Sequence, residues 1–421
     1  MHFRQLEHWI CCGSLLLPSS TTTWAADRSP HHWVASWGSA QQQPEPQNEL
    51  PAELWRDTTL RQIVHTSLGG NRLRVRISNV FGTTPLMVEA AGVALAVAPG
   101  KNDIVDGTAR TVTFSGRANV MIPAGADYYS DPLELTFSPG ADLAVSMHFK
   151  GEPVRQTGHP GSRTTSFITP SSRVGDSVWT QFTKVVHWYQ LSDIEVEVPA
   201  TVGAVVTIGD SITDGYGTTT DGNNRWPDAL AARLREANIP MGVVNAGIGG
   251  GRMLRDGLGP NTASRWDRDV LARSGVTHAI LLIGVNDVGN LRRNGDDSPE
   301  ARQRMVDDLT NAHRQMVLRA HAHGICVIGG TMTPYMGSDY YRPGAANEAD
   351  RQVINTWIRS SGTFDAVADF DAATRDAALP NRLDKEADSG DGLHPSLAGL
   401  RAIAQAVPLS ALQRGCGASR Y

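Results

Sequence analysis

Five residues along the chain have the types that acyl transfer through a serine nucleophile requires. Ser211 offers a hydroxyl group, which becomes nucleophilic at neutral pH only when a nearby base accepts its proton. His394 could be this base, and Asp391, three residues before it, could orient its imidazole. The backbone N–H groups of Ser211 and Gly250 and the side-chain amide of Asn286 could donate hydrogen bonds to the oxyanion of a tetrahedral intermediate. This set predicts serine-based acyl transfer, which needs neither a metal nor a cofactor.

Two of these assignments have a rival close by in the sequence. Residues 247–251 are rich in glycine, so Gly249 is the alternative to Gly250 as the oxyanion donor. Asp388 is the alternative to Asp391, but the shorter spacing to the histidine favours Asp391. The serine could also act only as a helix N-cap, and the asparagine only as a turn residue.

Aromatic side chains near the predicted nucleophile could contact a substrate. Trp226 stands at the start of a predicted helix and is the candidate substrate-binding residue, with core packing as the alternative. Tyr335, Tyr340 and Tyr341 follow a predicted strand, where they could stack on a sugar ring or cover a loop.

The second half of the chain has the pattern of a parallel sheet. Short, continuous apolar runs alternate with longer helical patterns, which predicts strands buried on both faces and a doubly wound, three-layer α/β fold. In such folds the ligand site lies beyond the carboxyl ends of the strands, where the polar segments named above fall. The predicted strands are 204–208, 242–245, 278–284, 325–329 and 366–369, and the predicted helices are 226–238, 299–323, 347–359 and one after residue 395.

The first half of the chain has a period of two instead. Residues 71–78 alternate arginine with apolar side chains, and residues 133–137 and 194–198 behave in the same way. Short alternating strands separated by turns predict an antiparallel β-sandwich or jelly roll. The arginine stripe in residues 71–78 is expected to be a solvated strand face. The predicted organisation is a signal peptide at 1–25, a β-sandwich domain at 30–198 and a catalytic domain at 201–415.

Composition limits the class of partner. The chain has 421 residues and a formal net charge of −5, so it has no basic footprint for nucleic acid. Arg4, an apolar run at 9–17 and small residues up to Ala25 predict a secretory signal and a secreted or periplasmic protein. No later run approaches the roughly 20 apolar residues that a membrane span needs, so no membrane insertion is expected. Neither the composition nor the charge of the sequence indicates an oligomeric state.

Cysteine spacing offers no zinc site, because the four cysteines form neither a CxxC pair nor a Cys/His array. Cys326 and Cys416 could form a disulfide in an exported protein. The interpretation preferred from the sequence is two separate thiols.

The four polar segments together resemble the blocks of the SGNH hydrolases, also called the GDSL esterase/lipase family. The matching segments are Gly209–Ile212, Asn245–Gly250, Gly284–Asp287 and Asp391–His394. The resemblance implies a flavodoxin-like α/β/α sandwich, a Ser211 nucleophile, oxyanion donors at Gly250 and Asn286, and a His394–Asp391 pair. Two departures from the family pattern are Ile212 in place of leucine and Gly251-Arg252 after the second block.

The first half is similar to the β-domain that precedes the catalytic domain in a bacterial branch of secreted GDSL-type esterases. The segments 65–70 and 188–192 carry this likeness. Together with the predicted export signal, the resemblance leads us to expect a secreted serine esterase. Its expected substrates are short-chain esters, principally acetyl esters, on a polysaccharide or a small molecule. The alternatives are a lipase or short-chain lipid esterase, and a non-catalytic carbohydrate-binding protein that reuses the fold.

Overall fold

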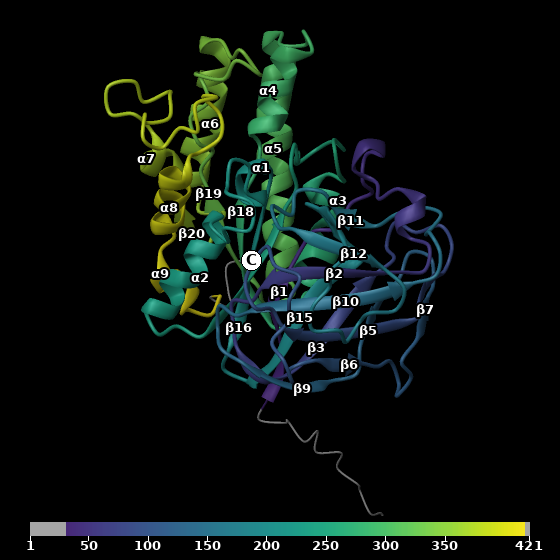
Figure 1. Ribbon diagram of the computed structural model, residues 1–421. Coiled ribbons are helices and arrows are strands. Elements are labelled where there is room, and N and C mark those ends of the chain that lie inside the picture. The colour runs from purple at the N-terminus through teal and green to yellow at the C-terminus, as the bar shows by residue number, and fades with distance from the viewer. Residues whose placement is uncertain (1–30, 417–421) are drawn as a thin grey trace, which may run out of the picture.

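The computed structural model describes residues 31–416. The expected signal peptide at 1–25 lies outside the described residues. The described chain has two parts, which lie against each other (Figure 1). We call residues 31–199 the β-rich region and residues 203–416 the parallel-sheet region.

The β-rich region contains two antiparallel sheets, in which apolar side chains from alternate positions form a shared core. One sheet has the order β1-β15-β3-β8, with β9 also pairing with β3. Its strands are β1 (His31–Gly38), β15 (Leu191–Pro199), β3 (Gly70–Ser78), β8 (Asp127–Tyr129) and β9 (Leu133–Phe137). The other has the order β13-β12-β2-β10-β5-β6. Its strands are β13 (Thr183–Val185), β12 (Ser166–Pro170), β2 (Thr58–His65), β10 (Asp142–Phe149), β5 (Ala90–Leu95) and β6 (Arg110–Val112).

Shorter elements complete the β-rich region. Two small antiparallel pairs join β11 to β14 and β4 to β7. These elements and two short helical turns are β11 (Gly158–His159), β14 (Trp188–Tyr189), β4 (Leu86–Val88), β7 (Val120–Ile122), η1 (Pro46–Asn48) and η2 (Ala52–Leu54).

The second part contains a five-stranded parallel sheet, as its apolar runs predict. Its order is β17-β16-β18-β19-β20, so the chain starts in the interior of the sheet and then moves outward in both directions. The strands are β16 (Gly203–Gly209), β17 (Met241–Gly247), β18 (Val276–Leu282), β19 (Cys326–Gly330) and β20 (Ala366–Ala368). The first three strands are neighbours, so their carboxyl ends bring three of the predicted polar segments to one place.

Helices contact both faces of this sheet through two apolar clusters. Val206 and Ile208 of β16 point into one cluster and Val205 into the other, as the alternation along a strand requires. The first cluster includes residues of α3 (Thr262–Trp266), η3 (Asp267–Leu271), α4 (Val285–Arg293), α5 (Pro299–His321) and α6 (Ala345–Ser360). The second includes residues of α1 (Ser211–Asp214), α2 (Trp226–Glu236), α7 (Phe370–Thr374), α8 (Leu397–Ala406) and α9 (Leu409–Leu412).

The β-rich region covers the open edge of the parallel sheet at β17. Ser39, just after β1, forms a bridge with Asn245, and the Val243 N–H donates to the Ser67 hydroxyl at 2.8 Å. An exposed edge strand is a template for unwanted pairing, and this contact removes it. The two parts are therefore closely joined along β17.

The arginine stripe of β3 lies at this junction and is not a solvated face. Strand β15 places acidic residues opposite it, and Arg74 contacts Glu195 at 2.6 Å. Arg76 is 9% exposed and contacts Asp193, which also pairs with Arg273 of the parallel-sheet region. The expectation of solvation was wrong for Arg74 and Arg76, which the cross-strand partners and the second region cover, whereas Arg72 is 40% exposed.

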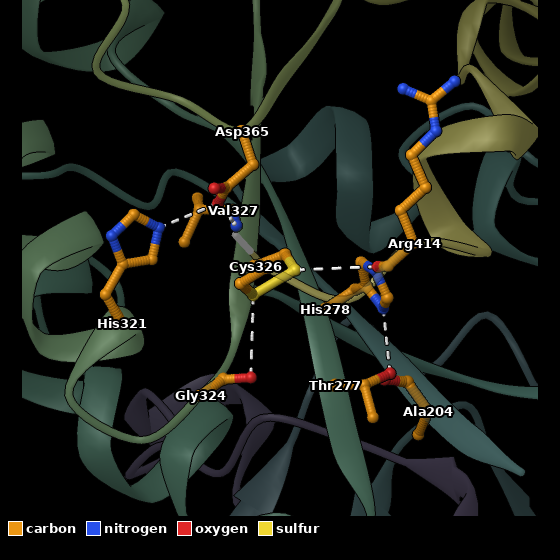
Figure 2. The surroundings of a disulfide bond; sticks show 10 residues. Ala204, Thr277, His278, His321, Gly324, Cys326, Val327, Asp365 and Arg414 are labelled. Carbon is orange, nitrogen blue, oxygen red and sulfur yellow. Dashed lines mark hydrogen bonds and ion pairs between the residues drawn. A yellow bond between two sulfur atoms is a disulfide. The ribbon is translucent and has the colours of Figure 1, made fainter. Parts of the chain in front are cut away.

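A disulfide joins Cys326, the first residue of β19, to Cys416, with a Cα–Cα distance of 5.2 Å (Figure 2). The interpretation as two separate thiols is therefore corrected. After α9 the chain returns to the start of β19, which brings the two cysteines within bonding reach. The bond lies at the amino-terminal edge of the sheet, opposite to the edge that holds the polar segments. In residues 31–416, no helix is both long and apolar enough to cross a membrane.

Candidate active site

Ser211 lies at the carboxyl end of β16, where the strand turns directly into the short helix α1. Asp210 caps this helix, because its side chain accepts the Ile212 N–H at 3.0 Å. The N–H of Ser211 has no acceptor among the described residues, as is usual for the first turn of a helix. The serine therefore presents both a hydroxyl group and a free backbone donor at the edge of the sheet.

His394 connects this serine to Asp391. The Ser211 Oγ lies 2.9 Å from His394 Nε2, and His394 Nδ1 lies 2.6 Å from Asp391 Oδ2. The other carboxylate oxygen of Asp391 accepts the backbone N–H groups of residues 393 and 394. A carboxylate beside Nδ1 favours the tautomer that carries its proton there, which leaves Nε2 free to accept the serine proton. Asp388, the rival acid, instead accepts N–H groups of its own loop at residues 390 and 392.

The environment of His394 tunes its basicity. Burial lowers the pKa of His394 below its usual value, and the hydrogen bond and charge of Asp391 oppose this shift. The positive charge of Arg163 lowers the same pKa further. Burial raises the pKa of Asp391, but hydrogen bonds from His394 outweigh it, so the pKa of that carboxyl lies below its usual value. The pair thus combines an ionised carboxylate with a neutral imidazole at neutral pH.

These shifts predict the acid limb of the pH–rate profile. Because a base must be neutral to accept a proton, kcat/KM is expected to fall as pH drops through the pKa of His394, below the usual histidine value of 6.5. Arg163→Gln removes a charge that lowers this pKa, so the limb should move to higher pH. Asp391→Asn removes a charge that raises it, so the limb should move to lower pH while the rate falls at every pH. Profiles of kcat/KM for the three proteins test this, and a limb that moves in the same direction in both variants would contradict it.

The glycine-rich turn after β17 supplies a second backbone donor. The Gly251 N–H donates to the Ile248 carbonyl at 2.9 Å, which closes the turn. The Gly249 N–H donates to Asp214 Oδ2 at 3.0 Å, so this rival donor is already engaged. Gly250 has φ of 65°, a conformation that favours glycine, and its N–H has no acceptor among the described residues. The geometry therefore favours Gly250 over Gly249.

Asn286 supplies the third donor from the first turn of α4, a helix that the sequence interpretation did not include. Its side-chain Nδ2 donates to the Gly251 carbonyl at 2.7 Å, and the Tyr341 hydroxyl donates to its Oδ1 at 2.5 Å. The Gly251 carbonyl oxygen can only accept a hydrogen bond, so the amide atom of Asn286 that contacts it is the nitrogen Nδ2. Its second N–H has no acceptor among the described residues.

Two buried carboxyl groups shape the loops around these donors. Asp287 accepts the N–H groups of Met253 and Leu254 at 2.8 and 3.1 Å, which fixes the chain that follows the glycine turn. Burial raises the pKa of Asp287 to about 6 and that of Asp210 to about 7. Their contacts hold loops and caps, so neither takes the place of Asp391 beside the histidine.

The five predicted catalytic and oxyanion-binding groups line one cavity of about 730 Å³, as do Tyr340 and Tyr341, whereas Tyr335 is fully buried and does not line it. The cavity contains Ser211, Gly250, Asn286, Asp391 and His394. Trp226 is fully buried in the core instead and contacts Phe370, so its prediction as a substrate-binding residue is corrected. Its position at the start of α2 turns the indole inward under the sheet.

The sequence interpretation missed the part of the β-rich region that forms the opposite wall. Polar side chains from this region that line the cavity are Gln42, Glu45, Asn48, Arg163 and His187, with Pro160 beside them. Arg163 lies over the ring of Tyr216, which in turn stacks on His394 with ring centroids 3.9 Å apart. These contacts join residues far apart in the sequence, and no local pattern marks them.

One family model and several solved structures match part of the chain. Residues 207–402 match the model of the GDSL-like lipase/acylhydrolase family. No curated protein matches the chain. Among solved structures, an acetylxylan esterase from Geobacillus stearothermophilus is 22% identical, with 48% of this chain and 91% of that chain covered and a TM-score of 0.36. An α/β hydrolase from the metagenome of Lake Arreo is 23% identical, with 50% and 94% covered and a TM-score of 0.35. A GDSL-like lipase from Bacteroides thetaiotaomicron is 16% identical, with 50% and 87% covered and a TM-score of 0.36.

Proposed function

We propose that this protein is an exported serine esterase that hydrolyses short-chain, principally acetyl, esters of a polysaccharide, because residues 207–402 match the model of the GDSL-like lipase/acylhydrolase family. One observation carries the proposal. Ser211, His394 and Asp391 form a continuous hydrogen-bonded relay in a cavity that also contains three candidate oxyanion donors. The strand order 2-1-3-4-5 and the helices on both faces support a flavodoxin-like three-layer fold for residues 201–415.

The proposed mechanism has two acyl-transfer steps. Ser211 Oγ attacks the ester carbonyl carbon while its proton passes to His394 Nε2, and Asp391 stabilises the resulting imidazolium. The oxyanion is held by the N–H groups of Ser211 and Gly250 and the Nδ2 of Asn286. When the carbon–oxygen bond to the alcohol breaks, His394 returns the proton to the leaving alcohol. A water molecule, deprotonated by His394, then attacks the acyl-enzyme and releases the carboxylic acid and Ser211.

The lining of the cavity supports a hydrophilic substrate. Among the described residues that line it, the aliphatic ones are Pro160, Leu258 and Leu393, and Tyr216, Tyr340 and Tyr341 add aromatic rings that each carry a hydroxyl group. The wall contributed by the β-rich region is polar, as hydroxyl-rich sugars require. A second hollow of about 530 Å³ shares Asp339, Tyr340 and Tyr341 with the first, so space continues past the catalytic centre.

Export is the remaining part of the proposal. The segment expected to direct it, residues 1–25, precedes the described chain. The Cys326–Cys416 disulfide supports the proposal, because such bonds persist in oxidising compartments and are rare in the cytosol.

The test of this function is a series of p-nitrophenyl esters of increasing acyl length, together with covalent labelling by a fluorophosphonate. We expect the highest kcat/KM with acetate, a steep fall with longer chains, and label on the peptide that contains Ser211. A preference for long chains would overturn the polysaccharide proposal in favour of a lipid esterase. Neither turnover nor labelling would favour a non-catalytic binding protein.

Tyr340 offers a test of the polysaccharide part. The residue is 56% exposed where the two hollows meet, and the Arg293 guanidinium lies 4.0 Å from the centre of its ring. Tyr340→Ala is expected to raise KM for an acetylated xylo-oligosaccharide by about tenfold, equivalent to about 1.4 kcal/mol of lost contact. The KM for p-nitrophenyl acetate should change much less, because this small ester does not extend into the second hollow.

The matched control for this prediction is Tyr128→Ala. Tyr128 lies on β8 and is also exposed, but it is not among the residues that line either hollow. Equal effects of the two substitutions on the oligosaccharide, or equal effects of Tyr340→Ala on both esters, would contradict the assignment of Tyr340 to a sugar subsite.

A further inference from the structure

One carboxylate joins the β-rich region to the turn that carries Gly250. Asp214, the last residue of α1, is buried and lies three residues after Ser211. Its Oδ1 lies 2.8 Å from Nε2 of His159, and its Oδ2 accepts the Gly249 N–H at 3.0 Å. A single side chain thus contacts a histidine from one region and the glycine turn of the other.

His159 is held on three sides in the β-rich region. It is 4% exposed and lies on β11, where its ring stacks on Trp188 with an interplanar angle of 28°. Its Nδ1 donates to the Ala40 carbonyl at 2.8 Å, because a carbonyl can only accept, and a second proton lies between Nε2 and Asp214 Oδ1. The imidazole therefore has a fixed orientation, and its Nε2 is aimed at Asp214.

The site around Asp214 is closely packed. A Cβ added at Gly161 of the β-rich region would lie 2.1 Å from Asp214 Oδ2, so the backbone of that region approaches the carboxylate directly. A buried carboxylate is costly unless it is paired and hydrogen-bonded, and His159 and Gly249 supply these partners. His159 contacts Oδ1 of this carboxylate, and the Gly249 N–H contacts Oδ2. Without His159, Oδ1 would lose its contact, and Oδ2 would be held less firmly against the turn.

The turn itself depends on few contacts. Ile248 N–H donates to Gly209 at 3.1 Å, Gly251 N–H closes the turn onto Ile248, and Gly249 N–H binds Asp214. The remaining N–H, that of Gly250, is the free donor that lines the cavity. The Asp214 contact helps to set the direction of this donor, because it holds the preceding peptide unit, while Asn286 holds the Gly251 carbonyl on the other side.

We propose that His159 is a positioning residue for ester hydrolysis: through Asp214 it holds the turn that directs the Gly250 N–H toward the oxyanion. The proposal rests on the proposed esterase function, and it assigns the β-rich region a part in turnover. Oxyanion donors act because they are already oriented when charge develops, and small displacements of aligned groups are costly in rate.

The test compares His159→Leu with His159→Gln. Leucine removes the contact to Asp214, whereas the glutamine amide can donate to the same carboxylate. For His159→Leu we expect kcat on p-nitrophenyl acetate to fall by about 10- to 100-fold, with KM little changed. The Ki of a trifluoromethyl ketone, whose adduct with serine carries an oxyanion, should rise by the same factor. His159→Gln should recover most of both losses.

The control is His148→Leu, because His148 forms a similar pair with Asp57 at 3.0 Å on β10 of the β-rich region. It is expected to lower Tm without changing kcat. If His159→Leu lowers Tm and leaves kcat and Ki unchanged at temperatures well below Tm, the residue is only structural and the proposal is wrong.

A second measurement separates this proposal from the esterase function. Amide hydrogen exchange of the segment 248–251 should become faster in His159→Leu and return toward the wild-type rate in His159→Gln. If the wild-type protein hydrolyses no ester, the proposed function fails, while the exchange rates still decide whether His159 holds the turn. Unchanged exchange in both variants would overturn the positioning role.

Discussion

Ser211→Ala is expected to abolish ester hydrolysis, lowering kcat by more than about 10⁴-fold. The proposed relay begins at the serine hydroxyl, 2.9 Å from the imidazole nitrogen, and alanine leaves neither a nucleophile nor a proton to transfer. The oxyanion donors would remain, but they could stabilise only the intermediate that forms by direct attack of water. The residual rate should be that of water attack in an oriented site.

Folding should not change in this variant, because the substitution removes one partly buried hydroxyl group. Tm and the Cys326–Cys416 disulfide are expected to match the wild type. Kinetics with p-nitrophenyl acetate and fluorophosphonate labelling read by intact mass test the prediction. Ser360→Ala is the control, since Ser360 is exposed at the end of α6 and its hydroxyl contacts only its own helix. Turnover within tenfold of the wild type in Ser211→Ala would remove Ser211 from the mechanism.

The part of the site that the sequence predicted follows from topology. Ser211, Gly250 and Asn286 each come shortly after a strand of the parallel sheet, and β17, β16 and β18 are neighbours. Apolar runs reveal such strands, and the carboxyl ends of parallel strands meet at one edge. The His394–Asp391 pair needed only its own loop, because three residues separate the two side chains.

The predictions that failed depend on contacts between distant segments. The arginines of β3 looked solvated because their alternation is that of a half-exposed strand, but Glu195 and Asp193 lie opposite them on β15. Trp226 looked available to a substrate because it stands near the nucleophile, yet the first turn of α2 faces the core. Neither the register of two strands nor the rotation of a helix is contained in a local pattern.

The cavity wall formed by the β-rich region also depends on contacts between distant segments, which no local sequence pattern reveals. These contacts bear on the proposed function. Arg163 acts on His394 through its charge, and His159 acts on the glycine turn through Asp214. Both come from a region whose sequence indicated only a sandwich. A version of the protein reduced to residues 201–415 would expose the β17 edge and lose one side of the cavity, so both regions are needed to enclose it.

The third oxyanion donor can be isolated by Asn286→Asp, which keeps the size of the side chain and its acceptor for Tyr341 while removing both N–H groups. We expect kcat to fall by about 10²- to 10³-fold with a small change in KM, because the donor binds charge that appears only in the transition state. The introduced carboxylate would also lie beside the developing oxyanion, so Asn286→Ala, which adds no charge, should lose less than Asn286→Asp.

Stability must be measured beside these rates, because Asn286 is 3% exposed and bonded at both ends of its amide. Alanine leaves the Gly251 carbonyl and the Tyr341 hydroxyl unpaired, at a cost of about 1 to 3 kcal/mol in unfolding free energy. Tyr341→Phe separates the two effects: it removes the contact that orients Asn286 but keeps the donor, so its kcat should lie between those of Asn286→Ala and the wild type. If kcat followed stability across the three variants and not the presence of the donor, Asn286 would hold the loop of Gly251 and leave the oxyanion to the two backbone N–H groups.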